Sequence, residues 1–258
     1  MVASQNLSID ILEQEKHQPI HQWAYQVLRT NIIELHIKPA QRISEKEVSE
    51  ALGISRTPVR EAFIRLAGDG LILITPQKRS IVTPIDLEQA QEARFVRLAL
   101  EKAVLREACN SFSTADIEAL KSNIQTQRDC QRAKAYDRML IVDNEFHRLI
   151  FRGCKKEQSW FYVKKMDHNY DRLRTMVMPL SLDHIIVEHT ALVQIIERGD
   201  IEHIDDAVDR HLTWETINAV VLDYPAQYFK QDFRASSEIV GPRRSRSAKT
   251  RQKGGERR

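Results

Sequence analysis

The apolar residues of this chain recur three and four positions apart over most of its length, which is the spacing of amphipathic helices. Three such segments open the chain, at residues 20–35, 44–52 and 55–67. Pro39 ends the first and Gly53 the second, because proline cannot continue a helix and glycine favours its C-terminal end. Ser44, followed three residues later by Glu47, is typical of a capping box at the start of the second helix. The pattern therefore predicts three short helices.

Two short runs with β character follow these helices. Residues 71–75 and 80–83 are rich in branched apolar side chains, and residues 76–79 between them predict a hairpin with a basic tip. Three helices followed by a hairpin predict a winged helix-turn-helix over residues 18–85. The first 17 residues are polar and irregular, and we expect a flexible N-terminal segment over residues 1–17.

Beyond the hairpin the helical spacing continues almost without interruption. Six segments carry it, at residues 87–111, 115–132, 135–153, 157–178, 183–198 and 201–223. Ser113 and Ser181 are suited to cap helices. Pro179 is expected to break the helical pattern, and Gly199 to form a tight connection. Six helices joined by short loops predict an all-α bundle over residues 86–229, so the fold class is mostly α, in two domains.

Length and composition fit this arrangement and exclude several other classes. A chain of 258 residues with 42% hydrophobic content can bury two compact cores. It does not open with a basic and then apolar leader, and no stretch approaches about 18 uninterrupted apolar residues, so we expect a soluble cytoplasmic protein without a membrane partner. The cysteines are odd in number and widely spaced, which favours reduced thiols over disulfides or a zinc ribbon. They are Cys109, Cys130 and Cys154.

The C-terminal residues differ from the rest of the chain in charge. Residues 234–258 hold nine basic and two acidic side chains, a net charge of +7, whereas the whole chain has a net charge of +3. The preceding residues are therefore mildly acidic. Because the tail offers almost nothing to bury, we expect residues 230–258 to be disordered. Two interpretations stay open: a weak, nonspecific attraction to nucleic acid, or a solvated end without a specific role.

The third predicted helix has two faces with different chemistry. Its apolar side chains share one face, and guanidinium and hydroxyl groups near its start share the other. An arginine fork can bind the O6 and N7 atoms of guanine bidentately, whereas lysines on the second helix and the hairpin tip are suited to phosphates. A solvated charged face is the alternative. The predicted DNA contacts are Lys46, Ser55, Arg56, Thr57, Arg60, Arg65, Lys78 and Arg79.

Four residues of types that commonly bind metals fall on faces that a bundle would bury. Asp143 and His147 are four residues apart on one helix, and His189 and His211 belong to the apolar stripes of two later segments. Burying each without a partner costs about 1–3 kcal/mol, and one divalent ion would satisfy all four. This set suits zinc, and also nickel, cobalt, iron or manganese; four separately hydrogen-bonded core residues are the alternative. The histidines expected at the surface are His168, His184 and His203.

Residues 41–86 resemble the DNA-binding domain of the GntR family of bacterial transcription regulators. The resemblance lies in SEKEVSEALGISRTPVREA, in RLAGDGLI and in VTPID. It implies that Arg56 and Arg60 read bases. The residues that it implies for contacts to the DNA backbone are Ser55, Thr57 and Lys46. One feature departs from the family pattern, because residues 77–80 replace the usual glycine-rich hairpin tip with a sequence that holds two basic side chains.

Residues 87–223 resemble the FCD effector domain of the FadR subfamily within the GntR family. The matching motifs are RLALE at residues 97–101, DNEFH at residues 143–147 and EHTALVQII at residues 188–196. The resemblance implies a divalent metal bound by Asp143, His147, His189 and His211. It also implies that a small carboxylate effector occupies open positions on this ion with help from nearby polar side chains. The expected effector contacts are Arg97, Arg172, Arg174 and Asn218, for which ordinary salt bridges are the alternative role.

Together these features predict a homodimeric transcription regulator that binds double-stranded operator DNA. We expect a repressor whose operator affinity changes when a small organic or sugar acid binds to the metal-containing domain. Three alternatives stay open: the metal is itself the signal, the metal is purely structural, or the site is that of a metal-dependent hydrolase or lyase. We expect no enzymatic activity, because no further acid–base residue accompanies the four ligands at a suitable spacing.

Overall fold

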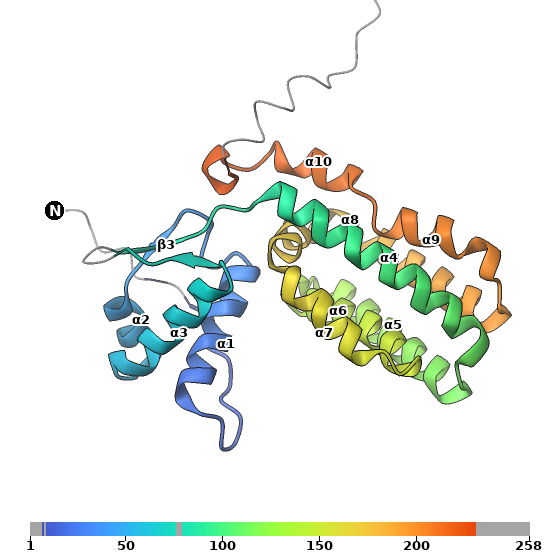
Figure 1. Ribbon diagram of the computed structural model, residues 1–258, viewed down its shortest axis with the longest axis horizontal. Helices are drawn as coiled ribbons and strands as arrows, with labels where there is room; N and C mark the ends of the chain where they lie inside the picture. Colours follow the sequence, from blue (N-terminus) through green and yellow to red (C-terminus); the bar gives the residue numbers. More distant parts are fainter. Residues whose placement is uncertain (1–6, 8, 76–78, 231–258) are drawn as a thin grey trace, which may run out of the picture.

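Three helices form the first lobe of the protein. The computed structural model describes residues 7, 9–75 and 79–230, and all three predicted helices are present. They are α1 (Ile20–Ile33), α2 (Glu45–Leu52) and α3 (Arg56–Gly68). Ser44 caps α2, since its Oγ accepts a hydrogen bond from the backbone N–H of Glu47, and Gly53 ends α2 with φ = 66°. The short turn after Gly53 then places α2 and α3 in a helix-turn-helix arrangement (Figure 1).

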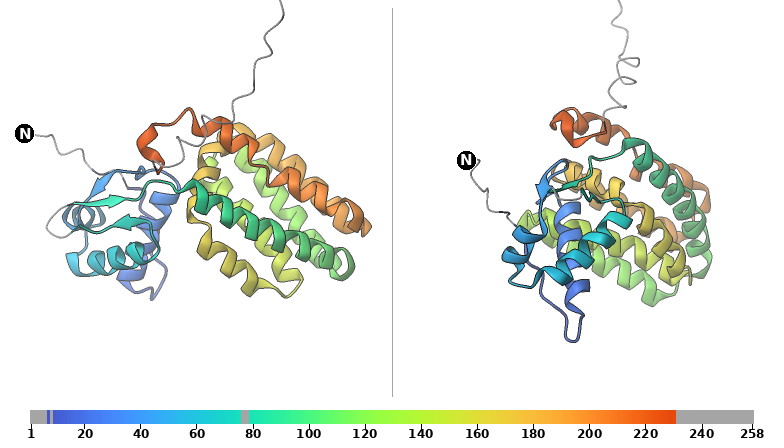
Figure 2. Two further views of the ribbon diagram at one scale, coloured as in Figure 1. Left: turned by 45° about the horizontal axis from the view of Figure 1, so that its top comes forward. Right: turned by 60° about the vertical axis from the view of Figure 1, so that its left-hand side comes forward.

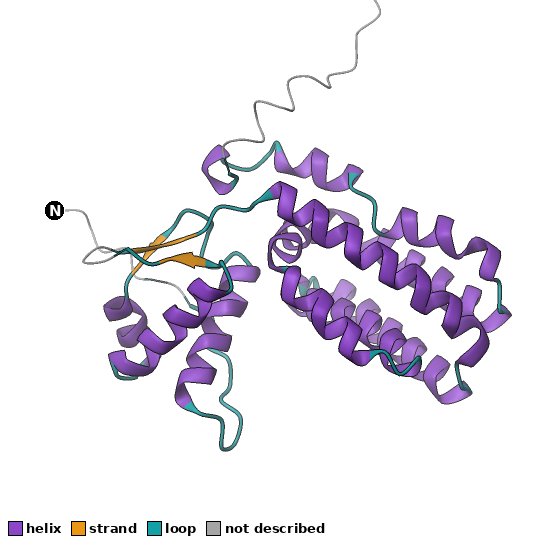
Figure 3. Ribbon diagram, in the orientation of Figure 1, coloured by secondary structure: helices purple, strands orange, loops and turns teal. Residues whose placement is uncertain are grey.

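A three-stranded antiparallel sheet completes this lobe (Figure 3). Its strands are β1 (Arg42–Ile43), β2 (Ile72–Leu73) and β3 (Ser80–Val82), in the order β1-β3-β2. β2 and β3 form the predicted hairpin, with Ile72 opposite Val82. The sequence pattern does not predict β1, because a strand of two residues is too short to show alternation. Residues 76–78 of the hairpin tip lie outside the described residues.

The second lobe is a helical bundle, as predicted. Its helices are α4 (Leu87–Ser111), α5 (Thr114–Ala133), α6 (Tyr136–Gly153), α7 (Glu157–Met166), α8 (His168–Arg198), α9 (Ile204–His211) and α10 (Glu215–Val221). α8 is the central helix and packs against α4, α5, α6, α9 and α10. Figures 1 and 2 show that α4 leads from the first lobe along the bundle. The single helix predicted over residues 201–223 is divided into a 3-10 turn at Ile201–His203, α9 and α10.

The helix boundaries differ from the prediction at Pro179. α8 continues through this residue over a length of 31 residues, and the break comes instead at Asp167, between α7 and α8. A proline inside a helix costs about 3 kcal/mol or more. The buried side chains of Met176 and Leu182 lie on either side of it, and their packing outweighs this loss. Ser181, predicted as a cap, lies inside α8, where its Oγ donates to a carbonyl one turn earlier.

By length and composition alone, α8 also qualifies as a helix that could cross a membrane. The central helix of a bundle meets the same criteria, because most of its neighbours are other helices and its side chains must be apolar on several faces. In this structure α8 has that central position, with α1 and the other helices of the bundle packed around it. Its apolar composition is therefore explained by packing within the bundle.

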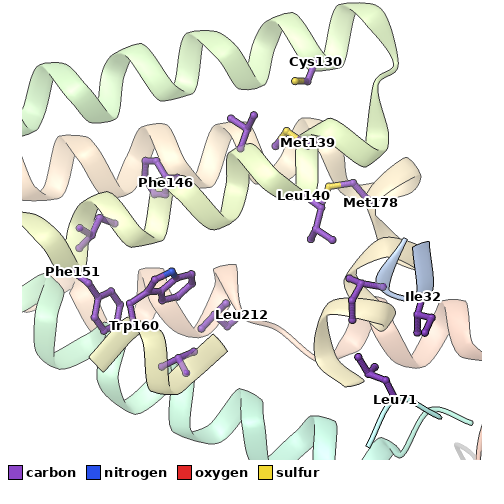
Figure 4. Packing of buried hydrophobic residues seen from close by; sticks show 14 of the residues in the cluster. Ile32, Leu71, Cys130, Met139, Leu140, Phe146, Phe151, Trp160, Met178 and Leu212 are labelled. Carbon is purple, nitrogen blue, oxygen red and sulfur yellow. The ribbon is translucent and has the colours of Figure 1, made fainter. Parts of the chain in front are cut away.

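One hydrophobic core extends through both lobes. Ile32 of α1 and Leu71 belong to the same buried cluster as Leu140 and Met178 of the bundle (Figure 4). Farther into the bundle, Phe146 belongs to this cluster and is fully buried. The first lobe is therefore packed against the bundle and is not suspended from it by a linker.

Polar contacts of α8 also join the two lobes. The fully buried guanidinium of Arg172 donates to the carbonyl oxygen of Thr83 at 2.7 Å. Three residues later, Thr175 Oγ1 donates to the carbonyl oxygen of Ile33 at 3.0 Å. Both acceptors belong to the first lobe, so a movement of α8 would be transmitted to it directly.

Part of the N-terminal segment packs against α1. Residues 9–17 contain no helix or strand. Trp23 Nε1 nevertheless donates to the carbonyl oxygen of Leu12 at 2.8 Å, and Asn31 exchanges two hydrogen bonds with the backbone of Asp10. These contacts hold Asp10 and Leu12 against α1, whereas the side chains of residues 13–17 are exposed. The flexibility predicted for residues 1–17 stays a prediction. The predicted basic tail, from residue 231 onward, lies outside the described residues, and the three cysteines are free thiols, as expected.

Candidate functional site

The start of α3 presents an exposed polar face. Ser55 is the N-cap residue, and the side chains of Arg56, Thr57 and Arg60 that follow it are exposed. No residue in the described part of the chain pairs with the guanidinium group of Arg56 or Arg60. Both guanidinium forks are therefore free to bind an external group, which is the requirement for a helix that reads bases.

The other basic residues predicted to contact DNA have different surroundings. Lys46 on α2 is exposed, and its Nζ lies 3.7 Å from a carboxylate oxygen of Glu50 one turn later. Such an exposed pair is weak, so the ammonium group stays available to a phosphate. Arg79 forms an ion pair with Glu47, which anchors the hairpin to α2. Lys78 lies outside the described residues.

Arg65 faces the bundle instead of the start of α3. It comes five residues after Arg60 and is therefore rotated by about 140° around the helix axis. Its guanidinium carbon lies 3.8 Å from the ring centroid of Tyr25. With Lys165 and His168 of the bundle it lines a cavity of about 340 Å³ at the junction of the lobes. This placement does not support the predicted DNA contact of Arg65, and it corrects the surface position expected for His168, which is half-buried.

Three histidines from different helices converge inside the bundle. His147 lies on α6, His189 on α8 and His211 at the end of α9. His211 Nε2 lies 3.1 Å from His147 Nε2 and 3.2 Å from His189 Nε2. Phe146 stacks on the ring of His189 with 4.0 Å between the ring centroids, which restricts the orientation of that ring. The structure thus brings together three of the four predicted metal ligands.

The outer nitrogen of each histidine has an acceptor of its own. The distances are 3.0 Å from His147 Nδ1 to Glu101 Oε2, 2.9 Å from His189 Nδ1 to Gln127 Oε1 and 3.0 Å from His211 Nδ1 to Glu188 Oε2. Carboxylate and amide oxygens only accept hydrogen bonds, so His189 and His211 carry the proton on Nδ1. The contact of His147 Nδ1 with Glu101 lacks hydrogen-bond geometry, but the nearby carboxylate favours the same tautomer. Each Nε2 then directs a lone pair to the centre. Three converging lone pairs repel one another and cannot form hydrogen bonds among themselves. A cation at the centre would satisfy all three.

Burial keeps the imidazoles of His147 and His189 neutral. It lowers the pKa of His147 to about 4, although Glu101 opposes this shift, and it lowers the pKa of His189 well below its usual value, with His211 adding to the effect. Burial raises the pKa of the Glu101 carboxyl, but His147 and Arg97 lower it more, so Glu101 is ionised. A neutral imidazole whose other nitrogen faces a carboxylate or amide oxygen, as in His147 and His189, is the state in which histidines bind metal ions.

Asp143, the predicted fourth ligand, borders the cluster. Its Oδ1 lies 3.7 Å from His189 Nε2, and its Oδ2 lies 3.8 Å from His147 Nε2. Arg174 forms an ion pair with Oδ2. Burial raises the pKa of the Asp143 carboxyl, but Arg174 and the histidines lower it more, so the net shift is downward. Oδ2 is therefore held by Arg174 and also faces His147, whereas Oδ1 faces His189.

A cavity of about 440 Å³ opens beside the cluster. Asp143, Arg174 and His211 line it, so the cavity reaches both the histidines and their neighbouring ion pair. Arg97 of α4 and Tyr170 of α8 also contribute to its wall. The cavity therefore gives a small molecule access to the convergence point of the imidazoles.

Arg97 has unused hydrogen-bonding capacity in this cavity. The residue is fully buried, and its Nε donates to Glu101 Oε1 at 2.6 Å. Nη1 lies 3.9 Å from Asp167 Oδ2, which is beyond hydrogen-bond distance. Neither Nη1 nor Nη2 has a hydrogen-bond partner within the described residues. Because an unpaired buried donor costs about 1–3 kcal/mol, these nitrogens are suited to bind an anion.

Each lobe of the protein matches a known protein family. Residues 21–82 match the family described as bacterial regulatory proteins, gntR family, and residues 92–213 match the FCD domain. The HTH-type transcriptional repressor RspR of Escherichia coli strain K12 is 33% identical over 201 residues, which are 76% of this chain and 86% of that relative. The chain belongs to the GntR family of bacterial transcription regulators.

Other members support this assignment. The Nta operon transcriptional regulator of Aminobacter aminovorans is 30% identical over 142 residues, which are 55% of this chain and 66% of that relative. The solved structure of Escherichia coli McbR/YncC has a TM-score of 0.68 at 18% identity to this chain. The superposition covers 81% of this chain and 100% of the McbR/YncC chain. At this identity the structural likeness shows the fold alone. GntR regulators bind operator DNA, so the chain is a transcription regulator and not an enzyme.

Of the four predicted effector contacts of this GntR regulator, two line the cavity beside the histidines and two lie outside it. Arg97 and Arg174 line the cavity. Arg172 supports the junction of the lobes, and Asn218 is exposed on α10, outside the cavity wall. Helical periodicity does not distinguish a cavity-lining arginine from one at the junction of the lobes. Arg172 and Arg174 lie on the same helix, and both are buried or nearly so. The remaining histidines, His184 and His203, are exposed, as expected.

The sequence reasoning missed the three acceptors behind the histidines. Glu101 is part of the RLALE motif, and Glu188 directly precedes His189. Gln127 lies between Ile124 and Cys130 on the buried stripe of α5. A polar residue inside an apolar stripe was the available signal for Gln127, but its partner lies 62 residues away and is not visible from the sequence.

Proposed function

We propose that this GntR regulator holds one divalent metal ion between His147, His189 and His211, with Asp143 as the fourth ligand. The convergence of three Nε2 atoms carries this proposal, together with the Nδ1–H groups that His189 and His211 donate to acceptors and the 3.0 Å contact of His147 Nδ1 with Glu101 Oε2. Such acceptors orient metal-binding rings and increase their basicity. The nitrogen-rich donor set suits zinc, and also nickel, cobalt, iron or manganese.

The same proposal places a small carboxylate effector in the adjoining cavity. The metal, when bound, would supply positive charge to one end of this anion. Arg97 would bind a carboxylate through its two unpaired Nη atoms, and Arg174 adds positive charge to the same wall. A cavity of about 440 Å³ accommodates a small organic or sugar acid.

The proposal also includes a homodimeric repressor. The relative RspR is named a repressor, and a two-fold dimer would place two α3 helices on the half-sites of a palindromic operator. An effector alters operator affinity only if it binds one arrangement of the two lobes more tightly than the other. A coupling free energy of about 1–3 kcal/mol changes the affinity about 5- to 150-fold. The proposed location is the cytoplasm, where operator DNA is found.

Thermal unfolding tests the metal and effector together. As-purified and metal-stripped protein are heated with a panel of small carboxylates, and metal content is measured on the same samples. We expect one acid to stabilise only the metal-loaded form, by about 2.7 kcal/mol at 100 times its Kd. Arg97→Gln should abolish this shift without loss of metal. Arg106→Gln, on the same helix but paired with Asp205 away from the cavity, should retain it.

Each other result contradicts a different part of the proposal. If metal stabilises the protein and no acid does, the effector is wrong and the ion is structural or is itself the signal. Operator affinity that follows free metal over a physiological range would then identify the ion as the signal. If metal neither copurifies with the protein nor stabilises it, the metal site is wrong.

Operator binding by the Arg60→Ala variant tests the reading helix. We expect a loss of about 1–3 kcal/mol on operator DNA and a much smaller loss on random DNA, because base contacts discriminate between sequences. Arg65→Ala is the matched control on α3, since its guanidinium packs on Tyr25 at the junction. Equal losses on both DNAs would show that Arg60 contacts only phosphate.

A further inference from the structure

A second group of metal-binding residue types lies at the junction of the two lobes. Glu34 and His36 directly follow α1, and Asp137 lies in the first turn of α6. One oxygen of each carboxylate and one ring nitrogen of His36 lie within 4.8 Å of one another. His36 Nε2 is 3.6 Å from Asp137 Oδ2, and His36 Nδ1 is 4.0 Å from Glu34 Oε2. The DNA-binding lobe thus supplies two residues of the group, and the bundle supplies the third.

The side chain of Glu34 and one ring nitrogen of His36 are buried without sufficient partners. The side chain of Glu34 is only 8% exposed, and the carboxyl group forms no hydrogen bond with any residue of the described chain. His36 Nδ1 is also buried and lacks a hydrogen-bond partner there. Burial raises the pKa of Glu34 to about 7, and Asp137 adds to this rise. A buried acid beside a second acid and an unpaired imidazole nitrogen is an environment that a cation would relieve.

We propose that Glu34, His36 and Asp137 form a second divalent-cation site, which bridges the DNA-binding lobe and the FCD domain. Ligand bonds of about 2.0–2.2 Å place neighbouring donor atoms about 3.0–3.5 Å apart. The two distances above involve different nitrogens of His36, and the donor atoms that one ion could share lie within 4.8 Å of one another, so binding requires the group to close further. Asp137 can supply this closure by rotation, because its side chain is 57% exposed. One imidazole and two carboxylates suit zinc, manganese or cobalt.

The position of this site gives it a mechanical role. α6 carries Asp137 in its first turn and Asp143 and His147 in its central turns. A cation at the junction would therefore connect the loop after α1 to the same rigid helix that supplies the histidine cluster. The second site would restrict the movement of the DNA-binding lobe relative to α6. It shares no ligand with the histidine cluster and does not depend on the function proposed for that cluster.

Cobalt binding by the full-length, untagged protein tests this proposal. Metal-stripped protein is titrated with Co²⁺ by equilibrium dialysis, and visible absorption of bound Co²⁺ reports coordination. We expect two equivalents for the wild type, one for His36→Gln and one for His211→Ala, with none for the double variant. His203→Gln, which removes an exposed histidine, is the matched control and should retain two equivalents.

Stoichiometry separates this proposal from the one for the histidine cluster. A single equivalent in the wild type that His36→Gln retains would overturn the second site. A single equivalent lost in His36→Gln and retained in His211→Ala would support the second site and contradict the first. Asp137→Asn provides an independent test if His36→Gln does not fold, because this exposed substitution removes one ligand without disturbing the core. Two equivalents retained in a folded Asp137→Asn variant would also overturn the proposal.

Discussion

Gln127→Met tests the support of the histidine cluster without changing a proposed ligand. The side chains have similar volumes, but methionine cannot accept the hydrogen bond from His189 Nδ1 that Gln127 Oε1 accepts at 2.9 Å. Both residues are fully buried, so no water can replace this acceptor. The ring of His189 would then be free to carry its proton on Nε2, which would direct a proton instead of a lone pair to the centre.

The size of the effect follows from this single hydrogen bond. Loss of an acceptor behind a metal-bound histidine weakens metal binding about 10- to 100-fold, which is about 1.4–2.8 kcal/mol. In either tautomer His189 Nδ1 loses its buried partner, which should lower the free energy of unfolding of the metal-free protein by about 1–3 kcal/mol. We therefore expect both metal affinity and metal-free stability to fall, with the larger total loss in the metal-loaded protein.

Competition with a chromophoric chelator measures zinc affinity, and urea unfolding of stripped protein measures stability. Gln125→Met on the exposed side of α5 is the matched control, since Gln125 donates to Asp129 at the surface. It should change affinity less than twofold. Unchanged zinc affinity in Gln127→Met, or an equal loss in Gln125→Met, would refute the assignment of Gln127 as the residue that orients His189.

Two further predictions concern pH and backbone conformation. Burial lowers the pKa of His168 to about 4, and the positive charges of Arg172 and Arg29 add to this shift. As pH falls below about 6.5, the unfolded chain therefore binds a proton at this histidine before the folded protein does. The free energy of unfolding should fall between about pH 6.5 and 4, by about 1–3 kcal/mol after allowance for partial exposure. In urea unfolding at several pH values, His168→Gln should lose less stability over this range than the wild type, and parallel curves would contradict the role of His168. Gly53→Ala should lower the free energy of unfolding by about 1 kcal/mol, because φ is 66° and an added Cβ meets no atom within 4 Å, so backbone strain alone acts. Gly68→Ala is the control, because an added Cβ there also meets no atom within 4 Å, but the φ of this residue of α3 is ordinary. This variant should unfold with an unchanged or higher free energy. A loss of stability similar to that of Gly53→Ala would contradict the explanation by backbone strain.

Local patterns in the sequence determined most helices and several of their ends. Helical spacing is a property of neighbouring residues, so it identified α1 to α6 and the buried faces of Asp143 and His147 without knowledge of the fold. The caps at Ser44 and Ser113 were predictable for the same reason, since each acceptor and donor pair is three residues apart. The motifs that resemble the GntR and FCD families identified the class of protein.

Tertiary packing decided what local spacing could not express. Periodicity shows which face of a helix is buried, but it does not show which buried faces meet. The course of α8 through Pro179 depends on side chains packed on both sides of the proline, and the acceptor of His189 comes from Gln127, 62 residues away. The opposite roles of Arg172 and Arg174 depend on two residues of separation, about 200° around the helix. Only the packed structure relates such positions, because the contacts that give each side chain its role join segments distant in the chain.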